Sequence, residues 1–319
     1  MGTTDSRAMI LGGTGFVGRH VCAELASRGR EVTVVGRRPP EREFPFRFVP
    51  LDLGATPEEE LSALLAAESP DTVVNCVGSI WTRDDKAMWA VAAEPVLRLV
   101  EALRRLPGPP RLVHLGSVLE YGPVPAGTTV GASVRPAPNG AYGKAKLAAT
   151  EAVLAGAAAG DFDAVVLRVA NVAGPGSPEV SLLGRVARQL LAAAGTTGPA
   201  MIELAPLRAH RDYVDVRDVA EAVAAAAEAE VTAEVVDIGR GEAVWVRSLV
   251  DLLVQASGIP ARVVERGEPG GPAQDWLQVD TRPAARLLGW SPRRSLAAAV
   301  SALWNEVAPT TNASNGMGG

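Results

Sequence analysis

The sequence predicts an α/β fold, a doubly wound parallel sheet joined to a smaller C-terminal lobe. In the first half of the chain, short β-rich runs alternate with longer helical patterns, which is typical of parallel strands covered by helices on both faces. A glycine-rich turn joins the first run to the first helix, and the alternation ends after Asn171. We therefore expect a dinucleotide-binding domain at residues 1–170, a substrate-binding lobe mainly at 171–309 with segments that return to the sheet, and a disordered tail at 310–319.

The elements of the first domain follow one another in regular order. Strands are expected at residues 8–12, 32–36, 47–51, 72–76, 111–117 and 164–170. Helices are expected at residues 15–28, 57–68, 86–105 and 142–159. Residues 121–140 are rich in Pro, Gly and Thr, and a loop of that length in a compact domain is usually functional or mobile.

The second half is less regular. Its helices are expected at residues 182–194, 220–229, 246–257 and 296–307. A small-residue linker with a strand is expected at 195–206, an αβ segment begins at 211–219, and a further strand is expected at 234–238. We expect this lobe to face the substrate.

Composition excludes several classes of protein. The 319 residues are enough for a large buried core, and a formal net charge of −5 argues against binding to nucleic acid. The apolar runs are only strand-length and the first residues are polar, so we expect a cytoplasmic enzyme with no signal peptide and no membrane partner. Cys22 and Cys76 do not form a CxxC pair, and the three histidines lack metal-ligand spacing, so no metal site is expected. The sequence leaves open whether the chain forms a homodimer.

The glycine-rich turn predicts a Rossmann-type dinucleotide site. It runs from Gly12 to Gly18 with the sequence GGTGFVG, and it leads from a strand into a helix. A pyrophosphate needs bare backbone N–H groups at close range and a helix N-terminus, and glycine allows that close approach. The cofactor contacts expected in this turn are Gly12, Thr14, Gly15, Phe16, Val17 and Gly18.

The end of the second strand predicts NADPH as the cofactor. NAD-binding proteins place an acidic residue there, whereas this chain has Gly36, Arg37 and Arg38. Two guanidinium groups suit a 2′-phosphate, which leaves NAD as the alternative cofactor and a solvated basic turn as the alternative interpretation. Asp52 either touches the adenine edge or is an exposed loop residue. The remaining expected cofactor contacts are Leu53, Cys76 and Val77.

A tyrosine and a lysine four residues apart predict a proton-transfer site. Tyr142 and Lys146 lie on one face of the expected helix, and Ser117 ends a strand before it. A free tyrosine has a pKa of about 10, and a nearby ammonium favours the phenolate. We therefore expect Lys146 to lower the pKa of Tyr142. The tyrosine would then exchange a proton with a carbonyl or alcohol oxygen that Ser117 also binds, and Tyr142 and Lys146 would both contact the cofactor.

With these motifs, the chain resembles the extended short-chain dehydrogenase/reductase family, the NAD-dependent epimerases, dehydratases and reductases of nucleotide sugars. The resemblance covers almost all of residues 7–305. Beyond the glycine turn and the YGKAK segment, it rests on HLGSVLEYG at 114–122, RVANVAGP at 168–175, RDYVDV at 211–216 and LGWSP at 288–292.

The resemblance implies roles for particular residues. The catalytic set it implies is Ser117, Tyr142 and Lys146. Asn171 and Arg211 would lie near the diphosphate of a nucleotide sugar, with Arg266 as a further candidate. The alternative for Arg211 is an ion pair with Asp212 or Asp215. The other expected substrate contacts are Ser79 and Trp81.

Departures from the family pattern narrow the expected chemistry. A 4,6-dehydratase of this family needs an acid and a base in the two positions after the catalytic serine or threonine, but this chain has Val118 and Leu119 there, and Glu120 comes one place too late. An epimerase usually holds NAD through the acid on the second strand, which is missing.

What remains is an NADPH-dependent reductase of a ketone on a nucleotide-linked sugar, with Tyr142 as proton donor. Such an enzyme resembles the 4-ketoreductases of dTDP-deoxysugar pathways, and this resemblance implies C4 as the carbon that is reduced. The alternatives are an NAD-dependent nucleotide-sugar epimerase, an oxidoreductase for a non-sugar carbonyl and a non-catalytic dinucleotide sensor. The abundance of Ala, Arg and Pro resembles a GC-rich coding sequence, as in antibiotic-producing bacteria.

Overall fold

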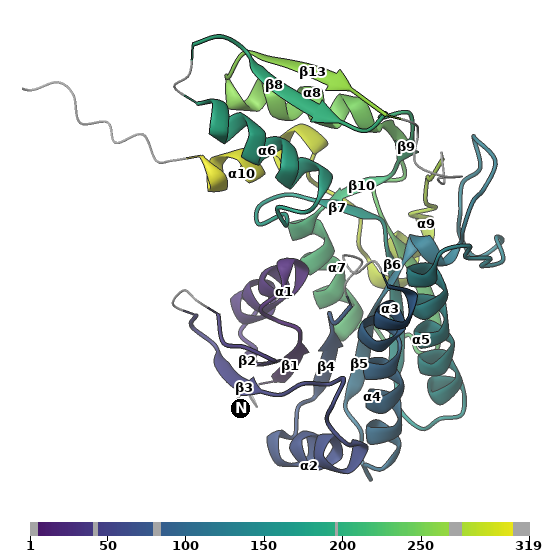
Figure 1. Cartoon of the computed structure of the whole chain (residues 1–319). Helices are drawn as coiled ribbons and strands as arrows, with labels where there is room; N and C mark the ends of the chain where they lie inside the picture. Colours follow the sequence, from purple (N-terminus) through teal and green to yellow (C-terminus); the bar gives the residue numbers. More distant parts are fainter. Residues whose placement is uncertain (1–5, 41–43, 79–83, 195–196, 268–275, 309–319) are drawn as a thin grey trace, which may run out of the picture.

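The computed structural model describes residues 6–40, 44–78, 84–194, 197–267 and 276–308. Within this part of the chain, a larger lobe is built around a parallel sheet, and a smaller lobe lies above it (Figure 1). No helix in the described ranges is long and apolar enough to cross a membrane.

A seven-stranded parallel sheet forms the centre of the larger lobe and confirms the predicted doubly wound α/β fold. Its strands are β1 (Arg7–Leu11), β2 (Glu31–Gly36), β3 (Arg47–Pro50), β4 (Thr72–Asn75), β5 (Arg111–Ser117), β6 (Ala164–Val169) and β11 (Glu234–Ile238). Their spatial order is β11-β6-β5-β4-β1-β2-β3. The chain therefore runs outward from β1 to β3 and then crosses to β4 on the other side of β1. A crevice opens at such a switch point, beyond the carboxyl ends of the strands.

Both faces of the sheet are buried, as a parallel sheet requires. Along β1, Ala8 and Ile10 enter one hydrophobic core while Met9 and Leu11 enter the other. The first core is covered by α1 (Phe16–Ser27), α7 (Val216–Glu228) and α9 (Arg282–Leu288). The second is covered by α2 (Glu58–Glu68), α4 (Glu94–Arg104) and α5 (Ala141–Ala158), with α3 (Asp85–Ala92) packed on α4 and α5.

The smaller lobe has its own hydrophobic core. Its helices are α6 (Leu182–Ala193), α8 (Val246–Ser257) and α10 (Leu296–Val307), and they pack with the parallel pair β8 (Ala200–Leu204) and β13 (Ala261–Glu265). Two short pairs connect the lobes: β7 (Asn171–Ala173) with β10 (Tyr213–Asp215), and β9 (His210–Arg211) with β12 (Val244–Trp245).

Several elements differ from the sequence-based expectation for local reasons. The single helix expected at 86–105 is two helices that meet at Ala93. Pro95 lies in the first turn of the second helix, where a missing N–H costs nothing. The helix expected from 220 begins at Val216, because the Asp215 side chain accepts a hydrogen bond from the backbone N–H of Arg217 and caps it. Strand β13 and helix α9 were not expected from the sequence.

Candidate active site

The turn after β1 is shaped for close backbone approach. Gly12 has φ +75°, a left-handed conformation that favours glycine. A Cβ on Gly18 would lie 2.3 Å from the carbonyl oxygen of Gly12, so α1 can pack on the turn only with glycine there. Gly15 precedes α1 without any side-chain cap. The first N–H groups of the helix therefore stay available to an anionic ligand.

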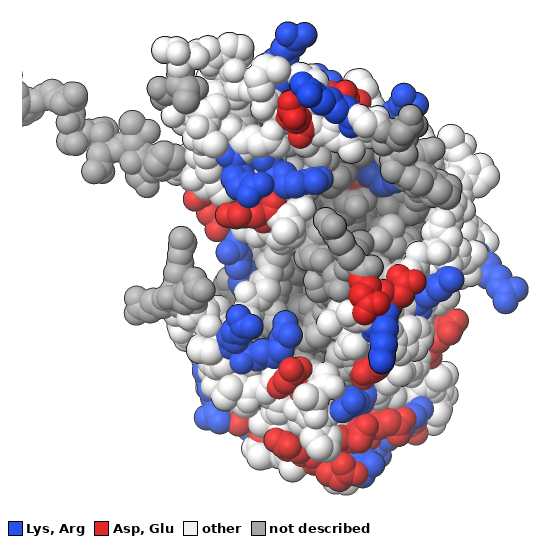
Figure 2. Space-filling view, viewed as in Figure 1, with Lys and Arg blue, Asp and Glu red and all other residues white. Residues whose placement is uncertain are grey.

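A cavity of about 280 Å³ extends from this turn and fits the adenosine side of a dinucleotide. Its lining includes the expected cofactor residues Gly12, Thr14, Gly15, Arg37, Asp52, Leu53, Cys76 and Val77. Arg38 is exposed beside it and is not among the lining residues. No described carboxylate pairs with Arg37, whereas Asp52 is held by a hydrogen bond of 3.0 Å from the backbone N–H of Gly54 to Oδ1. In the space-filling view, the molecule is hollowed between the two lobes, and Lys and Arg side chains lie on both sides of the hollow (Figure 2).

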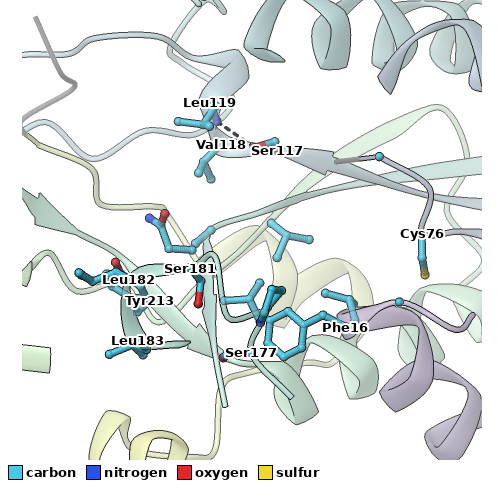
Figure 3. A pocket seen from close by; sticks show the side chains of 18 of the residues that line it. Phe16, Cys76, Ser117, Val118, Leu119, Ser177, Ser181, Leu182, Leu183 and Tyr213 are labelled. Atoms are coloured by element: carbon cyan, nitrogen blue, oxygen red, sulfur yellow. Dashed lines mark hydrogen bonds between the residues drawn. The ribbon is translucent and has the colours of Figure 1, made fainter. Parts of the chain in front are cut away.

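A second cavity of about 650 Å³ adjoins the first and shares Gly15, Cys76 and Gly78 with it. Phe16, Val17 and Gly18 of the glycine turn lie in its lining too. Ser117 and Tyr142 line it from the larger lobe. In the close-up view, Ser117 and Leu119 face the cavity opposite Ser181, Leu182 and Tyr213 of the smaller lobe (Figure 3).

Ser117 is held firmly at the end of β5. It is 9% exposed, and its Oγ accepts a hydrogen bond of 3.2 Å from the backbone N–H of Leu119. Its own backbone N–H donates to Oε1 of Glu120 over 2.8 Å. Together these bonds form a capping box on the single 3-10 turn η1 (Val118–Glu120).

Tyr142 stands at the start of α5, and its helix lies directly against η1. A Cβ on Gly143 would come within 2.4 Å of the carbonyl oxygen of Leu119. The glycine after Tyr142 therefore lets α5 approach the turn that follows Ser117. The position of Tyr142 relative to Ser117 is therefore fixed by backbone contact as well as by side-chain packing.

The expected lowering of the Tyr142 pKa by Lys146 is wrong for this arrangement. The surrounding protein penalises the phenolate and raises the pKa of Tyr142 to about 12, and the charge of Glu120 acts in the same direction. Lys146 donates from Nζ to the carbonyl oxygen of Leu115. Burial lowers the pKa of Lys146 to about 8, against the opposing effect of the Glu120 charge. Tyr142 is thus a phenol at neutral pH, the form that can donate a proton.

The structure brings some of the expected substrate residues to the larger cavity and not others. Asn171 is in the lining and donates from Nδ2 to the carbonyl oxygen of Asp212 over 3.1 Å. Arg211 is not among the lining residues; its Nη1 donates to the carbonyl oxygen of His210 over 3.1 Å. Arg266 is exposed and pairs with Glu203 at 3.1 Å. The other two expected contacts, Ser79 and Trp81, lie outside the described residues.

The carboxylates considered as partners of Arg211 are engaged elsewhere. Asp212 is fully buried and accepts hydrogen bonds from the backbone N–H groups of Arg240, Gly241 and Val279. Asp215 binds the guanidinium of Arg217 through both oxygens. Asp212 therefore fastens the segments after β11 and before α9 to the junction of the lobes.

Comparison with known proteins assigns the chain to a family. A model of the NAD dependent epimerase/dehydratase family matches residues 8–239. The chain belongs to this family. A curated relative is 44% identical over 304 residues, which are 95% of this chain and 96% of the relative: dTDP-6-deoxy-L-talose 4-dehydrogenase (NAD(P)(+)) of Kitasatospora kifunensis. GDP-6-deoxy-D-mannose reductase of Pseudomonas aeruginosa is 24% identical over 81% of this chain and 83% of its own length.

A solved structure has the same architecture. MoeE5 in complex with UDP-glucuronic acid and NAD is 26% identical and superposes with a TM-score of 0.81 over 94% of this chain and 98% of its own. Solved structures of this fold hold different cofactors: MoeE5 is in complex with NAD, and RMD from Pseudomonas aeruginosa, 22% identical with a TM-score of 0.79, is complexed with NADPH. Membership of the epimerase/dehydratase family therefore implies a nicotinamide dinucleotide but leaves open which one.

Within the epimerase/dehydratase family, the residues after Ser117 separate the possible chemistries. Val118 and Leu119 line the larger cavity, and no Asp or Glu is among its described lining residues. Glu120 is fully buried and binds Arg168, so it does not supply the missing acid or base. The described part of the cavity therefore offers no carboxyl group beside Ser117.

Sequence reasoning missed much of the wall on the small-lobe side. Ser177, Ser181, Leu182, Leu183 and Tyr213 line the larger cavity, although none was singled out. A signal for Ser181 was present, since a serine before a helical pattern predicts an N-cap, and its Oγ accepts from the backbone N–H of Gly184. Nothing local in the sequence indicates which face of Leu182 or Tyr213 meets the cavity, because that depends on how the lobes pack.

Proposed function

We propose that this chain is an NADPH-dependent ketoreductase that acts on C4 of a nucleotide-linked 6-deoxysugar. The observation that carries the proposal is that the Ser117 hydroxyl and the Tyr142 phenol line one cavity directly beside the glycine turn. The sequence of the Kitasatospora kifunensis relative, whose name describes C4 oxidoreduction of a dTDP-6-deoxysugar, supports the choice of carbon and substrate class.

Residues of this chain can supply the proton that the carbonyl oxygen needs during reduction. The bound nicotinamide supplies the hydride for the carbonyl carbon in reduction and accepts it in oxidation. As the carbonyl oxygen gains charge, Tyr142 donates its phenolic proton to that oxygen, and the Ser117 hydroxyl donates a hydrogen bond to it. The backbone N–H of Leu119 already donates to Ser117 Oγ, which leaves the serine hydrogen free to point at substrate. Oxidation of the alcohol is the same path in reverse.

The apolar character of the cavity favours a deoxysugar. In a hexose, C6 is two bonds from C4, so it must lie close to the residues next to Ser117. Val118 and Leu119 line the cavity there and offer no hydrogen-bond partner for a 6-hydroxyl. A methyl group at C6 gives up no hydrogen bond when it contacts these apolar side chains. A hydroxyl group gives up its hydrogen bonds to water and finds no replacement there.

Turnover of a dTDP-4-keto-6-deoxyhexose with labelled NADPH tests the proposal. We expect NADPH consumption and the label at C4. Tyr142→Phe should reduce kcat by about 10²- to 10⁴-fold, since it removes the proton donor, while NADPH binding stays near normal. Label at C3, or no turnover with any 4-ketosugar, would contradict the proposal. Stoichiometric NAD⁺ released when the purified protein is denatured would instead favour an epimerase.

A further inference from the structure

A buried carboxylate lies behind Ser117, on the side away from the cavity. Glu120 is fully buried and makes three hydrogen bonds. Its Oε1 accepts from the backbone N–H of Ser117 at 2.8 Å and from Oγ1 of Thr150 at 3.1 Å. Its Oε2 accepts from Nε of Arg168 at 2.7 Å. Glu120 therefore joins the end of β5, helix α5 and strand β6, the three elements around the proton-transfer site.

The neighbouring backbone is shaped to admit this carboxylate. A Cβ on Gly116 would lie 2.8 Å from Oε1 of Glu120 and 3.3 Å from Oγ1 of Thr150. A side chain at position 116 would therefore displace the glutamate from the N–H of Ser117. Glu120 can therefore take this place only because position 116, near the end of a buried strand, carries no side chain.

Glu120 belongs to a larger group of polar and titratable side chains that lie next to one another. The Arg168 guanidinium lies 4.9 Å from the centre of the Tyr121 ring, and the Tyr121 hydroxyl donates to the carboxylate of Asp237 at 2.9 and 3.0 Å. From α5, Lys146 and Tyr142 both feel the charge of Glu120. His114 of β5 and Cys76, the residue after β4, face Lys146 in turn.

The charge of Glu120 acts on both proton-transfer groups in one sense. It disfavours the phenolate and so raises the pKa of Tyr142, and it favours the ammonium and so raises the pKa of Lys146. Both effects keep a proton on the pair. For ketone reduction, that is the starting state required of the donor.

We propose that Glu120 is a positioning residue, which anchors the main chain of Ser117 against α5 and places a buried negative charge next to the proton-transfer site. This inference rests on the proposed function for its kinetic part only. It assigns the glutamate a role in the reaction although the residue touches neither substrate nor cofactor.

The pH profile of reduction tests the charge. Glu120→Gln keeps the shape of the side chain but removes the charge, so the pKa values of Tyr142 and Lys146 should both fall. The alkaline limb of kcat should then move to lower pH by about one unit. Glu151→Gln removes an exposed charge from the same helix and should leave the limb in place. Thr150→Val removes a hydrogen bond to Glu120 without changing charge, so it should lower Tm and also leave the limb in place.

Glu120→Asp separates position from charge. The shorter side chain keeps the carboxylate but loses the reach to the Ser117 N–H, so kcat should fall while KM changes little and the pH limb stays within about 0.3 units of the wild type. Glu120→Gln leaves Arg168 without its buried counter-ion and could prevent folding. In that case Glu120→Asp still tests the positioning role of Glu120. Unchanged kcat in a folded Glu120→Asp would overturn the positioning role.

A titration without substrate tests the same inference independently of the reaction. The chain has only three tyrosines, so the difference in tyrosinate absorbance between the parent protein and its Tyr142→Phe variant reports one phenol. That phenol should ionise at lower pH in the Glu120→Gln background than in the wild type. If no ketosugar is reduced, the proposed function fails and this titration still decides the charge of Glu120. A folded Glu120→Gln protein with an unmoved titration would overturn the inference.

Discussion

Arg37 and Arg38 are adjacent in sequence but not equivalent in the structure. Both side chains are exposed, but Arg37 lines the cavity that extends from the glycine turn and Arg38 is not among its lining residues. The sequence predicts a pair of guanidinium groups at the 2′-phosphate, and the structure makes Arg37 the better placed of the two. Cofactor preference at this position should therefore depend on one side chain.

Arg37→Asp should reverse that preference. Loss of a charge-assisted hydrogen bond to the phosphate, with a like charge in its place, should weaken NADPH binding by about 10- to 100-fold and improve NADH. Fluorescence titration of each cofactor measures both constants. Arg38→Asp is the matched control and should change the NADPH constant much less. Equal affinities of the wild type for NADPH and NADH would refute the assigned role.

At the scale of elements, the proposed catalytic geometry depends on how closely α5 approaches η1. Gly143 allows this approach, because any Cβ there meets the backbone of Leu119. Backbone cannot move aside as the end of a flexible side chain can. The tyrosine is therefore positioned by a residue that takes no part in the chemistry.

Gly143→Ala should push the start of α5 away from η1 and separate Tyr142 from Ser117. We expect kcat to fall by about 10²-fold, the usual scale for a displacement of about 1 Å in a catalytic group, with the cofactor constant nearly unchanged. Gly140→Ala, one residue before the helix, is the control, since nothing lies within 4 Å of a Cβ at that position. Similar losses in both variants would show that helix stability, and not the approach to Leu119, matters.

The sequence predicted the helices and strands better than it predicted the contacts between them. The glycine turn, the β-rich runs and the YGKAK helix were predictable because their signals are local: period, chain breakers and spacing. Helix α8 was expected at 246–257 and is found at Val246–Ser257. Glu120 was set aside as one place too late for catalysis, since its meaning depends on Arg168 and Thr150, which are far away in the chain. The raised pKa of Tyr142 was mispredicted for the same reason, because burial outweighs a helical neighbour.

At the scale of the whole molecule, the first helix joins the two lobes. Arg19 of α1 pairs with Glu306 of α10 at 3.0 Å, and Nε2 of His20 donates to the carbonyl oxygen of Pro175 at 2.9 Å. The same helix begins at the glycine turn. Its N-terminal end thus lines the larger cavity, while its side binds the segment that leads to Ser177 and Ser181. The two cavities share a wall for this reason, and the lobes meet where the proposed hydride transfer takes place.

The buried carboxyl group of Asp237 should make stability of the whole chain depend on pH. Burial raises its pKa from 3.8 to about 7, so the folded state holds a proton that the unfolded chain has already lost. For a raised pKa, the stabilisation is complete below the unfolded value and disappears as pH rises through the folded one. Asp237 should therefore remove on the order of 2 kcal/mol of stability between about pH 5 and pH 7.

Asp237→Asn isolates this contribution. The amide oxygen can still accept from the Tyr121 hydroxyl, but the group no longer titrates. His20 and His114, whose pKa values are lowered, act in the opposite sense in both proteins, because their neutral forms are favoured on folding. Only the difference between the two proteins is therefore informative. Denaturant unfolding across this pH range should show the wild type losing stability relative to Asp237→Asn as pH rises. Parallel curves would mean that Asp237 is already ionised in the fold and that Arg168 compensates its charge.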